Sequence, residues 1–379
     1  MKILITGDFF VSDNFKGQQL FDPSVIELFE SADYRIVNLE APLTSDEKKN
    51  RILKTGPHLR SSADTTLPYL QQLRVDLVTL ANNHIMDYGA KGLSDTINCL
   101  RENNMSFVGA GKDLREAAKP FTLEKDGLRV AILNFAENEW SIAEDSAPGA
   151  NPLDIIDNVK QIQEAKRSHD KVLVIIHGGH EYYHYPSPRM AKQYRFYAEN
   201  GADAIVGHHT HCIGGYEVHQ GTPIFYSLGN FVFTKSSVLD IWHEGLLLEL
   251  NFSKGPETCF KLTPANQHRE NHGVGLIPEA GKKKLLGHLE LINEVIRDHN
   301  MLEKEWEFFL KSKSDQYLNN VSFVNGVCSK YIRAALIRLR IGKTLRSRRY
   351  YRSILNLLRC EAHSDAAKEV LLRFLKSNN

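Results

Sequence analysis

The stretch Gly-Ala-Asp-Ala-Ile-Val-Gly-His-His-Thr-His, residues 201–211, decides the fold class. Its apolar part, Ala202–Val206, is typical of a short buried β-strand. Three imidazoles then follow within four residues, at positions 208, 209 and 211. Because such a cluster at the end of a strand has little structural use, we interpret it as a metal-binding segment.

The same design recurs through the first two thirds of the chain, where short apolar runs alternate with segments that can be helical. Continuous Val, Ile and Leu runs predict strands that are buried on both faces, and therefore an α/β core. We expect further strands at Lys2–Thr6, Tyr34–Leu39, Asp76–Ala81, Arg129–Phe135, Lys171–Ile176 and Thr222–Tyr226, and helices at Gly89–Asn103, Asp154–Ser168 and Ser187–Asn200.

A polar residue follows most of these strands directly. Asp8, Glu40, Asn83, His84 and His177 each stand at or just beyond the end of an apolar run. Open α/β sheets place their ligand sites at the carboxyl ends of parallel strands, so these side chains are expected to converge. Carboxylate, amide and imidazole ligands together suit Mn²⁺, Fe²⁺ or Zn²⁺, and a carboxylate can bridge two ions.

Each of these residues also has a structural interpretation. Asp8 can be a turn residue after the first strand, Asn82-Asn83-His84 can cap a helix, and His177 can be a core histidine. The ordered combination with residues 208–211 favours the metal site.

At this point the sequence resembles a known family, the capsule synthesis protein CapA family, which is linked to poly-γ-glutamate and capsule production and is similar to calcineurin-like metallophosphoesterases. The resemblance runs in order from Lys2 to about Phe252. The motifs that carry it are Asn-Leu-Glu (38–40), Ala-Asn-Asn-His-x-x-Asp-Tyr-Gly (81–89), His-Gly-Gly-His-Glu-Tyr (177–182), residues 201–211, and Tyr-Ser-Leu-Gly-Asn-Phe-Val-Phe (226–233).

The resemblance implies a fold and a site. The fold is an α/β (α+β) sandwich, a metallophosphoesterase-like two-sheet core flanked by helices. Asp8 and His211 would hold a first divalent ion of Mn, Fe or Zn, and Glu40 would bridge to a second. The second ion would also be held by Asn83, His177 and His209. His84 would be the catalytic residue, contacting the reacting oxygen or protonating a leaving oxygen, with His208 and Glu181 next to the ligands.

The sequence departs from the phosphoesterase pattern at the first strand. The superfamily has Asp-x-His there, whereas this chain has Asp8-Phe9-Phe10. Its bridging aspartate is replaced by the longer Glu40. We therefore expect a weak or empty first metal position, and one or two bound ions.

Composition and cysteine spacing exclude other classes. The 379 residues are 42% hydrophobic and 25% charged, which excludes a disordered or collagenous chain. The five cysteines show no C-x-x-C spacing, so neither a zinc knuckle nor a disulfide framework is expected. We find no signal peptide and no apolar run long enough for a membrane span, and expect a cytoplasmic protein.

The alternation of apolar runs and helical segments ends after Phe252. Residues 253–284 contain several prolines and glycines and are interpreted as a loop-rich boundary between a domain at 1–265 and a basic helical C-terminal region at 280–379. Helices are expected at Lys282–Asn300 and Glu303–Lys313, and near 329–341, 347–359 and 365–376. From residue 321 on, thirteen basic residues face three acidic ones. This basic tail could dock on the acidic first domain, or bind an anionic polymer or a membrane surface.

Three weaker signals are interpreted structurally or left open. Ser227-Leu228-Gly229-Asn230-Phe231 lacks the Gly-x-Ser-x-Gly elbow of a serine nucleophile and favours a turn. Gly109-Ala110-Gly111 is only a fragment of a dinucleotide loop. The aromatic segment Glu181–Tyr185 could contact a polymer substrate or pack between loops.

The expected function is a metal-dependent hydrolase that acts on a phosphoester or related anionic bond in capsule, exopolysaccharide or poly-γ-glutamate metabolism. A non-catalytic accessory protein that binds an anionic polymer or a partner of the capsule synthesis machinery is the alternative. An amide hydrolase of γ-linked glutamate would use the same metal chemistry. The expected partners are an anionic small molecule or polymer and capsule synthesis proteins, and no nucleic acid is expected.

Overall fold

The computed structural model describes residues 1–46, 48–54, 56–320 and 329–339, together with residues 351, 354, 355, 358 and 371. The chain divides into two compact units, Met1–Glu303 and Lys304–Asn379. The first unit contains both large sheets and all the predicted site residues. The expected helices near 347–359 and 365–376, and most of the basic tail, lie outside the described residues.

The larger sheet has eight strands. Seven follow the order β16-β15-β14-β1-β2-β3-β4, and β13 pairs with β1 outside this path. The strands are β1 (Lys2–Phe10), β2 (Tyr34–Leu39), β3 (Leu77–Thr79), β4 (Ser106–Val108), β13 (Asn230–Phe233), β14 (Glu244–Asn251), β15 (Cys259–Gln267) and β16 (Val274–Leu276). Strands β1 to β4 and β13 are parallel to their neighbours in this set, whereas β14, β15 and β16 pair antiparallel.

The smaller sheet has six strands in the order β11-β12-β10-β9-β7-β6. They are β6 (Phe121–Lys125), β7 (Leu128–Ala136), β9 (Lys171–His177), β10 (Ala204–His208), β11 (Tyr216–His219) and β12 (Thr222–Phe225). A two-stranded sheet joins β5 (Ala110–Gly111) to β8 (Gly149–Ala150).

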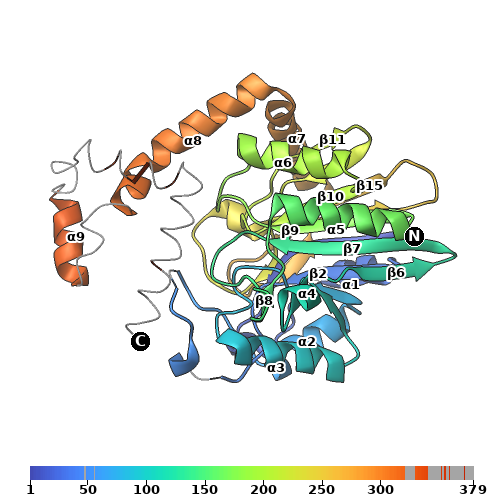
Figure 1. The fold of residues 1–379 in the computed structure, drawn as a ribbon, viewed down its shortest axis with the longest axis horizontal. Coiled ribbons are helices and arrows are strands. Elements are labelled where there is room, and N and C mark those ends of the chain that lie inside the picture. Colours follow the sequence, from blue (N-terminus) through green and yellow to red (C-terminus); the bar gives the residue numbers. More distant parts are fainter. Residues whose placement is uncertain are drawn as a thin grey trace. The chain divides into compact units, whose positions relative to one another are not determined.

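Helices cover the outer faces of the two large sheets, with α5 and α6 on one side and α2 and α3 on the other (Figure 1). The helices are α1 (Pro23–Glu30), α2 (Ala63–Gln72), α3 (Gly89–Glu102), α4 (Leu114–Ala117), α5 (Ile155–Ser168), α6 (Pro188–Glu199), α7 (Glu279–Arg297), α8 (His299–Asn320) and α9 (Lys330–Arg338). Three short 3₁₀ turns lie at Asp13–Phe15, Lys48–Asn50 and Asp240–His243. Among the described residues, we find no helix with both the length and the apolar character needed to cross a bilayer.

Side chains of β1 show why the strands are apolar on both faces. Ile3 and Ile5 belong to the cluster between the two large sheets, together with Ile132 and Val206 of the smaller one. Leu4 points the other way, into the cluster beneath α1, α2 and α3. Successive residues of a strand face opposite sides, so a strand covered on both sides needs a continuous apolar run. The expected two-sheet core flanked by helices is confirmed.

The boundary region differs from the expectation. Residues 253–284 were predicted as loop-rich, yet they contain the nine-residue strand β15. It pairs with β14 over eight residue pairs, from Glu244↔Asn266 to Asn251↔Cys259. Most of its side chains are exposed or half-buried, so the sequence carries no apolar run. Backbone hydrogen bonds to β14, rather than burial, define this strand.

Helix α7 belongs to the first unit, although we expected it in the C-terminal region. Ile292 and Ile296 of α7 belong to the apolar cluster beneath α5 and α6, and so does Leu302 at the start of α8. Asn293 Oδ1 accepts a hydrogen bond of 2.7 Å from the backbone N of Tyr216 on β11. The compact fold that carries the site therefore extends through residue 303.

Candidate metal centre

Four strand ends bring the predicted residues into one buried site. Asp8 lies in β1, Glu40 follows β2, His177 ends β9, and the histidines of residues 209 and 211 follow β10. The loop after β3 adds Asn83. Asp8 and Glu40 are fully buried, and His177 is 2% exposed. The convergence expected from parallel strand ends is confirmed.

Two ligand triads share Glu40. The first triad consists of Glu40, His177 and His209, which the resemblance assigned to the second ion. The second triad consists of Asp8, Glu40 and His211, which the resemblance assigned to the first ion. Within each triad, one potential ligand atom from each side chain lies within 4.8 Å of the others. Both triads combine carboxylate oxygen with imidazole nitrogen, the donor set of borderline divalent cations.

Asn83 stands next to the first triad. Its Oδ1 lies 3.1 Å from His177 Nε2, and the same ring nitrogen lies 3.1 Å from His209 Nδ1. Burial, and then the neighbouring His209, hold the pKa of His177 well below its usual value. The ring is therefore neutral near pH 7, the form in which an imidazole can ligate a metal.

The environment of Glu40 indicates whether the site suits a metal ion. Both carboxylate oxygens are buried and have no hydrogen-bond partner among the described residues. Burial and then the charge of Asp8 raise the pKa of Glu40 well above its usual value. Buried carboxylates are normally hydrogen-bonded, paired or bound to a metal. An orphaned carboxylate shared by two triads therefore fits a site for a metal ion.

Asp8 has the opposite electrostatic environment. Burial alone would raise its pKa, but His211, whose Nδ1 lies 3.5 Å from Asp8 Oδ2, and the nearby His177 lower it below its usual value. Asn38 Nδ2 donates to Asp8 Oδ1 at 2.7 Å, and the backbone N of His209 donates to Oδ2 at 3.2 Å. Asp8 is consequently held ionised and oriented.

The backbone between the two histidine ligands is strained. His209 has φ = 92° and His211 has φ = 54°, both in the left-handed region that non-glycine residues rarely adopt. Such strain persists only where the surrounding structure enforces it, and it is frequent at functional sites. This turn lets two histidines separated by one residue reach the two triads.

Asn230 orients His211, which the sequence did not predict. Its Nδ2 donates to the backbone O of Trp242 at 2.9 Å, so its Oδ1 faces His211 Nδ1, also at 2.9 Å. Since an amide oxygen only accepts, Nδ1 of His211 carries the proton, and Nε2 keeps its lone pair. That Nε2 lies 3.8 Å from Glu40 Oε1. The only sequence signal was the motif at 226–233.

Phe10 takes no part in either triad. It is 6% exposed and packs in an apolar cluster with Ala41, Leu59, Phe233 and Trp242. Residue 10 is thus part of an apolar cluster with Phe233 and Trp242, and it supplies no ligand to the triad of Asp8, Glu40 and His211.

His84 lies beside the triads. Its backbone N donates to Asn82 Oδ1 at 3.1 Å, and its Nδ1 lies 2.7 Å from Asp87 Oδ2. Burial lowers its pKa, and the hydrogen bond to Asp87 opposes that effect. His84 and Asn83 line a cavity of about 250 Å³ together with His211.

Aromatic and charged side chains complete this cavity. The lining also includes Lys54, Leu59, Glu139, Glu181, Tyr182, Phe233, Lys235 and Trp242. Tyr182 also has a left-handed backbone, with φ = 63°, and burial together with Glu181 raises its pKa to about 12. The ring of Trp242 lies 4.7 Å from that of His211. The cavity gives access to the metal-type residues.

His208 belongs to neither triad. Its Nε2 donates to the backbone O of Thr6 at 2.8 Å, and burial lowers its pKa. Glu181 lines the cavity and is exposed. The roles of both residues stay predictions.

Two glycine-containing motifs are structural. Ser227 Oγ accepts a 3.1 Å hydrogen bond from the backbone N of Gly229, within the expected turn. At Gly109, a Cβ atom would lie 2.1 Å from Asn134 Oδ1, so glycine permits close packing there.

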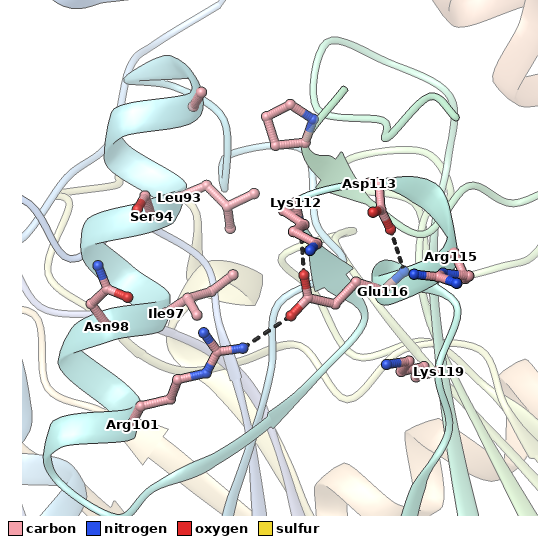
Figure 2. A pocket seen from close by; sticks show the side chains of 12 residues that line it. Leu93, Ser94, Ile97, Asn98, Arg101, Lys112, Asp113, Arg115, Glu116 and Lys119 are labelled. Carbon is pink, nitrogen blue, oxygen red and sulfur yellow. Dashed lines mark hydrogen bonds and ion pairs between the residues drawn. The ribbon is translucent and has the colours of Figure 1, made fainter. Parts of the chain in front are cut away.

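A larger hollow lies elsewhere, between α3 and α4. It has a volume of about 500 Å³ and contains none of the predicted site residues. Figure 2 shows Arg101 of α3 reaching toward Glu116 of α4, and their Nη2 and Oε1 atoms lie 2.9 Å apart. We name it the α3–α4 groove.

The fold and the site together define a two-sheet α/β protein flanked by helices, with a metal-type ligand cluster at its strand ends. Residues 2–235 match the family described as bacterial capsule synthesis protein PGA_cap. This span is more than half of the chain, and the chain belongs to that family.

Two Bacillus relatives agree with this assignment. The chain is 32% identical over 292 residues to the PGA biosynthesis protein CapA of Bacillus subtilis, covering 76% of this chain and 74% of that protein. It is 35% identical over 227 residues to the capsule biosynthesis protein CapA of Bacillus anthracis, covering 56% of this chain and 55% of that protein. A phosphatase structure from Mycoplasma pneumoniae aligns over 73% of this chain and 92% of its own, at 12% identity and a TM-score of 0.39.

Proposed function

We propose that the protein is a metal-dependent hydrolase that cleaves a phosphoester or a related anionic bond in capsule, exopolysaccharide or poly-γ-glutamate metabolism. The observation that carries this proposal is Glu40. Its two buried oxygens lack partners among the described residues, and it belongs to both ligand triads. Such a carboxylate is suited to bridge divalent cations.

The proposed ligands follow the two triads. Glu40, His177 and His209 would hold one ion with Asn83, whereas Asp8 and His211 would share Glu40 in the other position. Mn²⁺, Fe²⁺ and Zn²⁺ match this donor set. When bound, such an ion supplies Lewis-acid polarisation of the substrate and lowers the pKa of water. The position that lacks a histidine at residue 10 is expected to bind its ion more weakly.

The chain's own residues would orient and protonate the substrate. His84 lines the cavity beside Asn83, where it can donate a hydrogen bond to a reacting oxygen or protonate a leaving oxygen. Asn230 and Asn38 would hold His211 and Asp8 in place. The same arrangement could also act on a γ-linked amide.

A second candidate function has one specific observation in its favour. Phe10 replaces a ligand of the superfamily pattern and is buried in an aromatic cluster. A protein with an incomplete second triad could use the cavity to hold an anionic polymer, or a partner from the capsule synthesis machinery, without turnover. The names of the two Bacillus relatives place those proteins in capsule or PGA biosynthesis.

Metal content and turnover distinguish the two functions. The protein would be purified without chelators, analysed for Mn, Fe and Zn, and assayed with p-nitrophenyl phosphate, bis(p-nitrophenyl) phosphate and a γ-glutamyl anilide. We expect about one tightly bound ion and turnover that a Glu40→Gln variant loses together with the metal. A metal-loaded protein that hydrolyses none of these compounds would contradict the hydrolase and favour the accessory function.

A further inference from the structure

A buried ion pair lies directly behind His84. Lys54 Nζ contacts Asp87 Oδ1, and the two side chains are 3% and 0% exposed. Lys54 lies in the loop before α2, and Asp87 follows β3 in the segment that also carries His84. A buried ion pair gives little net stability compared with apolar packing, because both charges must be desolvated. Stability alone therefore does not explain why a lysine is buried here, and we consider a role in ligand binding.

The contacts of Asp87 fix the tautomer of His84. Besides Lys54, the Asp87 carboxylate accepts a 2.6 Å hydrogen bond from the backbone N of Leu59 and lies 2.7 Å from His84 Nδ1. With N–H groups from three residues directed at it, this carboxylate acts as a hydrogen-bond acceptor. Nδ1 of His84 therefore carries the proton and donates to Asp87.

With His84 in this tautomer, not every N–H group of the Lys54 ammonium has an acceptor among the residues that the structure describes. Its Nζ lies 3.2 Å from His84 Nδ1, but a protonated Nδ1 cannot accept a hydrogen bond from it. Within the described part of the chain, Asp87 is then the one acceptor for the three N–H groups of Lys54. Lys54 lines the same cavity as Asn83, His84 and His211. The N–H groups of Lys54 that lack an acceptor are therefore available to a ligand in this cavity.

We propose that Lys54 binds an anionic oxygen of the substrate next to His84, so that the cavity selects ligands with a phosphoryl or carboxylate group. The inference rests on the proposed function, because it assigns a substrate class to the same cavity. Hydrogen bonds between an ammonium and an anionic oxygen are strong and are strengthened further where water is excluded.

The size and charge of the cavity further restrict the class of ligand that it can bind. About 250 Å³ holds one anionic group with a few neighbouring atoms, which fits a small ester or the end of a chain. Glu139, Glu181 and Lys235 also line the cavity and are exposed, so two negative charges and one positive charge lie at its exposed side and disfavour a second anionic group there. The ligand would enter with its negative group directed toward Lys54.

Orthophosphate is the probe for the test, and binding is measured by isothermal titration calorimetry on the full chain loaded with its metal. We expect Lys54→Met to weaken phosphate binding about ten-fold or more, and Lys54→Arg to retain most of the affinity. Lys112→Met is the matched control, because Lys112 lies in the α3–α4 groove and not in this cavity. Its phosphate affinity should equal that of the wild type.

The single variant leaves Asp87 buried without its cation and can fail to fold. The double variant Lys54→Met/Asp87→Asn removes both charges and keeps the side-chain shapes close to the originals. Its thermal transition and metal content show whether the site is intact. If this folded, metal-loaded variant binds phosphate as tightly as the wild type, the proposal is wrong. The same holds if the wild type binds neither phosphate nor the monocarboxylate butyrate.

Butyrate, titrated in parallel, distinguishes carboxylate from phosphoryl recognition, since the probe with the tighter Lys54-dependent binding carries the preferred group. The outcome also separates this inference from the hydrolase proposal. Lys54-dependent anion binding without any ester turnover would support the anion site and contradict the hydrolase. Turnover whose KM and kcat are unchanged in the double variant would support the hydrolase and overturn the anion site.

Discussion

His209 occupies a backbone conformation that glycine would adopt more easily, yet its side chain is what the site requires. Its φ of 92° is enforced by the packing around it, and its backbone N donates to Asp8. A residue held in this way combines strain with a buried imidazole. Both features fit a role as a ligand rather than as a core residue.

Replacing His209 with Ala is expected to remove the tightly bound metal, because the first triad would keep only Glu40 and His177 as imidazole or carboxylate donors. Metal analysis after gel filtration measures the loss. His219→Ala is a suitable control, since His219 pairs with Glu199 near the surface, outside the site. Full metal content in His209→Ala with unchanged affinity would show that the ligand assignment is wrong.

His84→Ala should affect turnover rather than metal binding. Nδ1 of His84 is occupied by Asp87, and the residue lines the cavity beside the ligands. Loss of a positioned acid or oxyanion donor typically lowers kcat by about 10²- to 10⁴-fold. The measurement is kcat on any ester that the wild type cleaves, with metal content determined in parallel. A wild-type kcat in the variant would refute the role of His84.

At the scale of elements, the site depends on the close approach of β1 to the turn that precedes β13. Gly7 precedes Asp8, and a Cβ atom there would lie 2.0 Å from the backbone O of Gly229. The two strands are paired in register at Asp8↔Asn230. This pairing places Asp8 and the residue that orients His211 side by side.

Gly7→Ala is therefore expected to push β1 away from the turn and destabilise the fold by about 1–3 kcal/mol. The change should also weaken metal binding, since Asp8 is the next residue. Gly287→Ala provides the contrast, because Gly287 lies in α7 and a Cβ there meets nothing within 4 Å. That variant should gain roughly 0.5–1 kcal/mol from helix propensity. Urea unfolding measures both changes, and equal stability of the two variants would contradict this account.

At the scale of the whole molecule, the first compact unit is expected to be sufficient for the site. A chain that ends at Glu303 keeps Ile292, Ile296 and Leu302, which are 3%, 0% and 1% exposed. A chain that ends at residue 278 loses all three. Full burial of such side chains contributes about 1.5–3 kcal/mol each, so the shorter chain should lose about 5 to 9 kcal/mol and unfold.

Circular dichroism melting and metal analysis of the two shortened chains test this expectation. A native-like transition and normal metal content are expected for 1–303 but not for 1–278. If 1–278 melted like the full chain, the first unit would end close to the boundary predicted from the sequence. The docking of the basic tail lies mostly outside the described residues and stays a prediction, as does its binding to an anionic polymer or a membrane surface.

The sequence by itself determined the features that are local in the chain. Apolar runs buried on both faces predicted strands such as β1, β2, β7, β9 and β10, although not β14, and the polar residues that follow them predicted which side chains would meet. Asp8, Glu40, Asn83, His177, His209 and His211 do converge, because parallel strands present their carboxyl ends on the same side of a sheet. The resemblance supplied the expected pairing of these residues into two sets.

Only the tertiary structure decided which polar side chains form hydrogen bonds with the site residues. Asn230 meets His211 across 19 residues, and Lys54 meets Asp87 across 33. Their hydrogen bonds depend on how separate loops pack, and nothing in the neighbouring sequence records that packing. The strand β15 was missed for a similar reason, since its backbone bonds to β14 leave no apolar pattern in its side chains. Periodicity and spacing encode burial, whereas pairing between distant polar groups and strand edges is fixed by the fold as a whole.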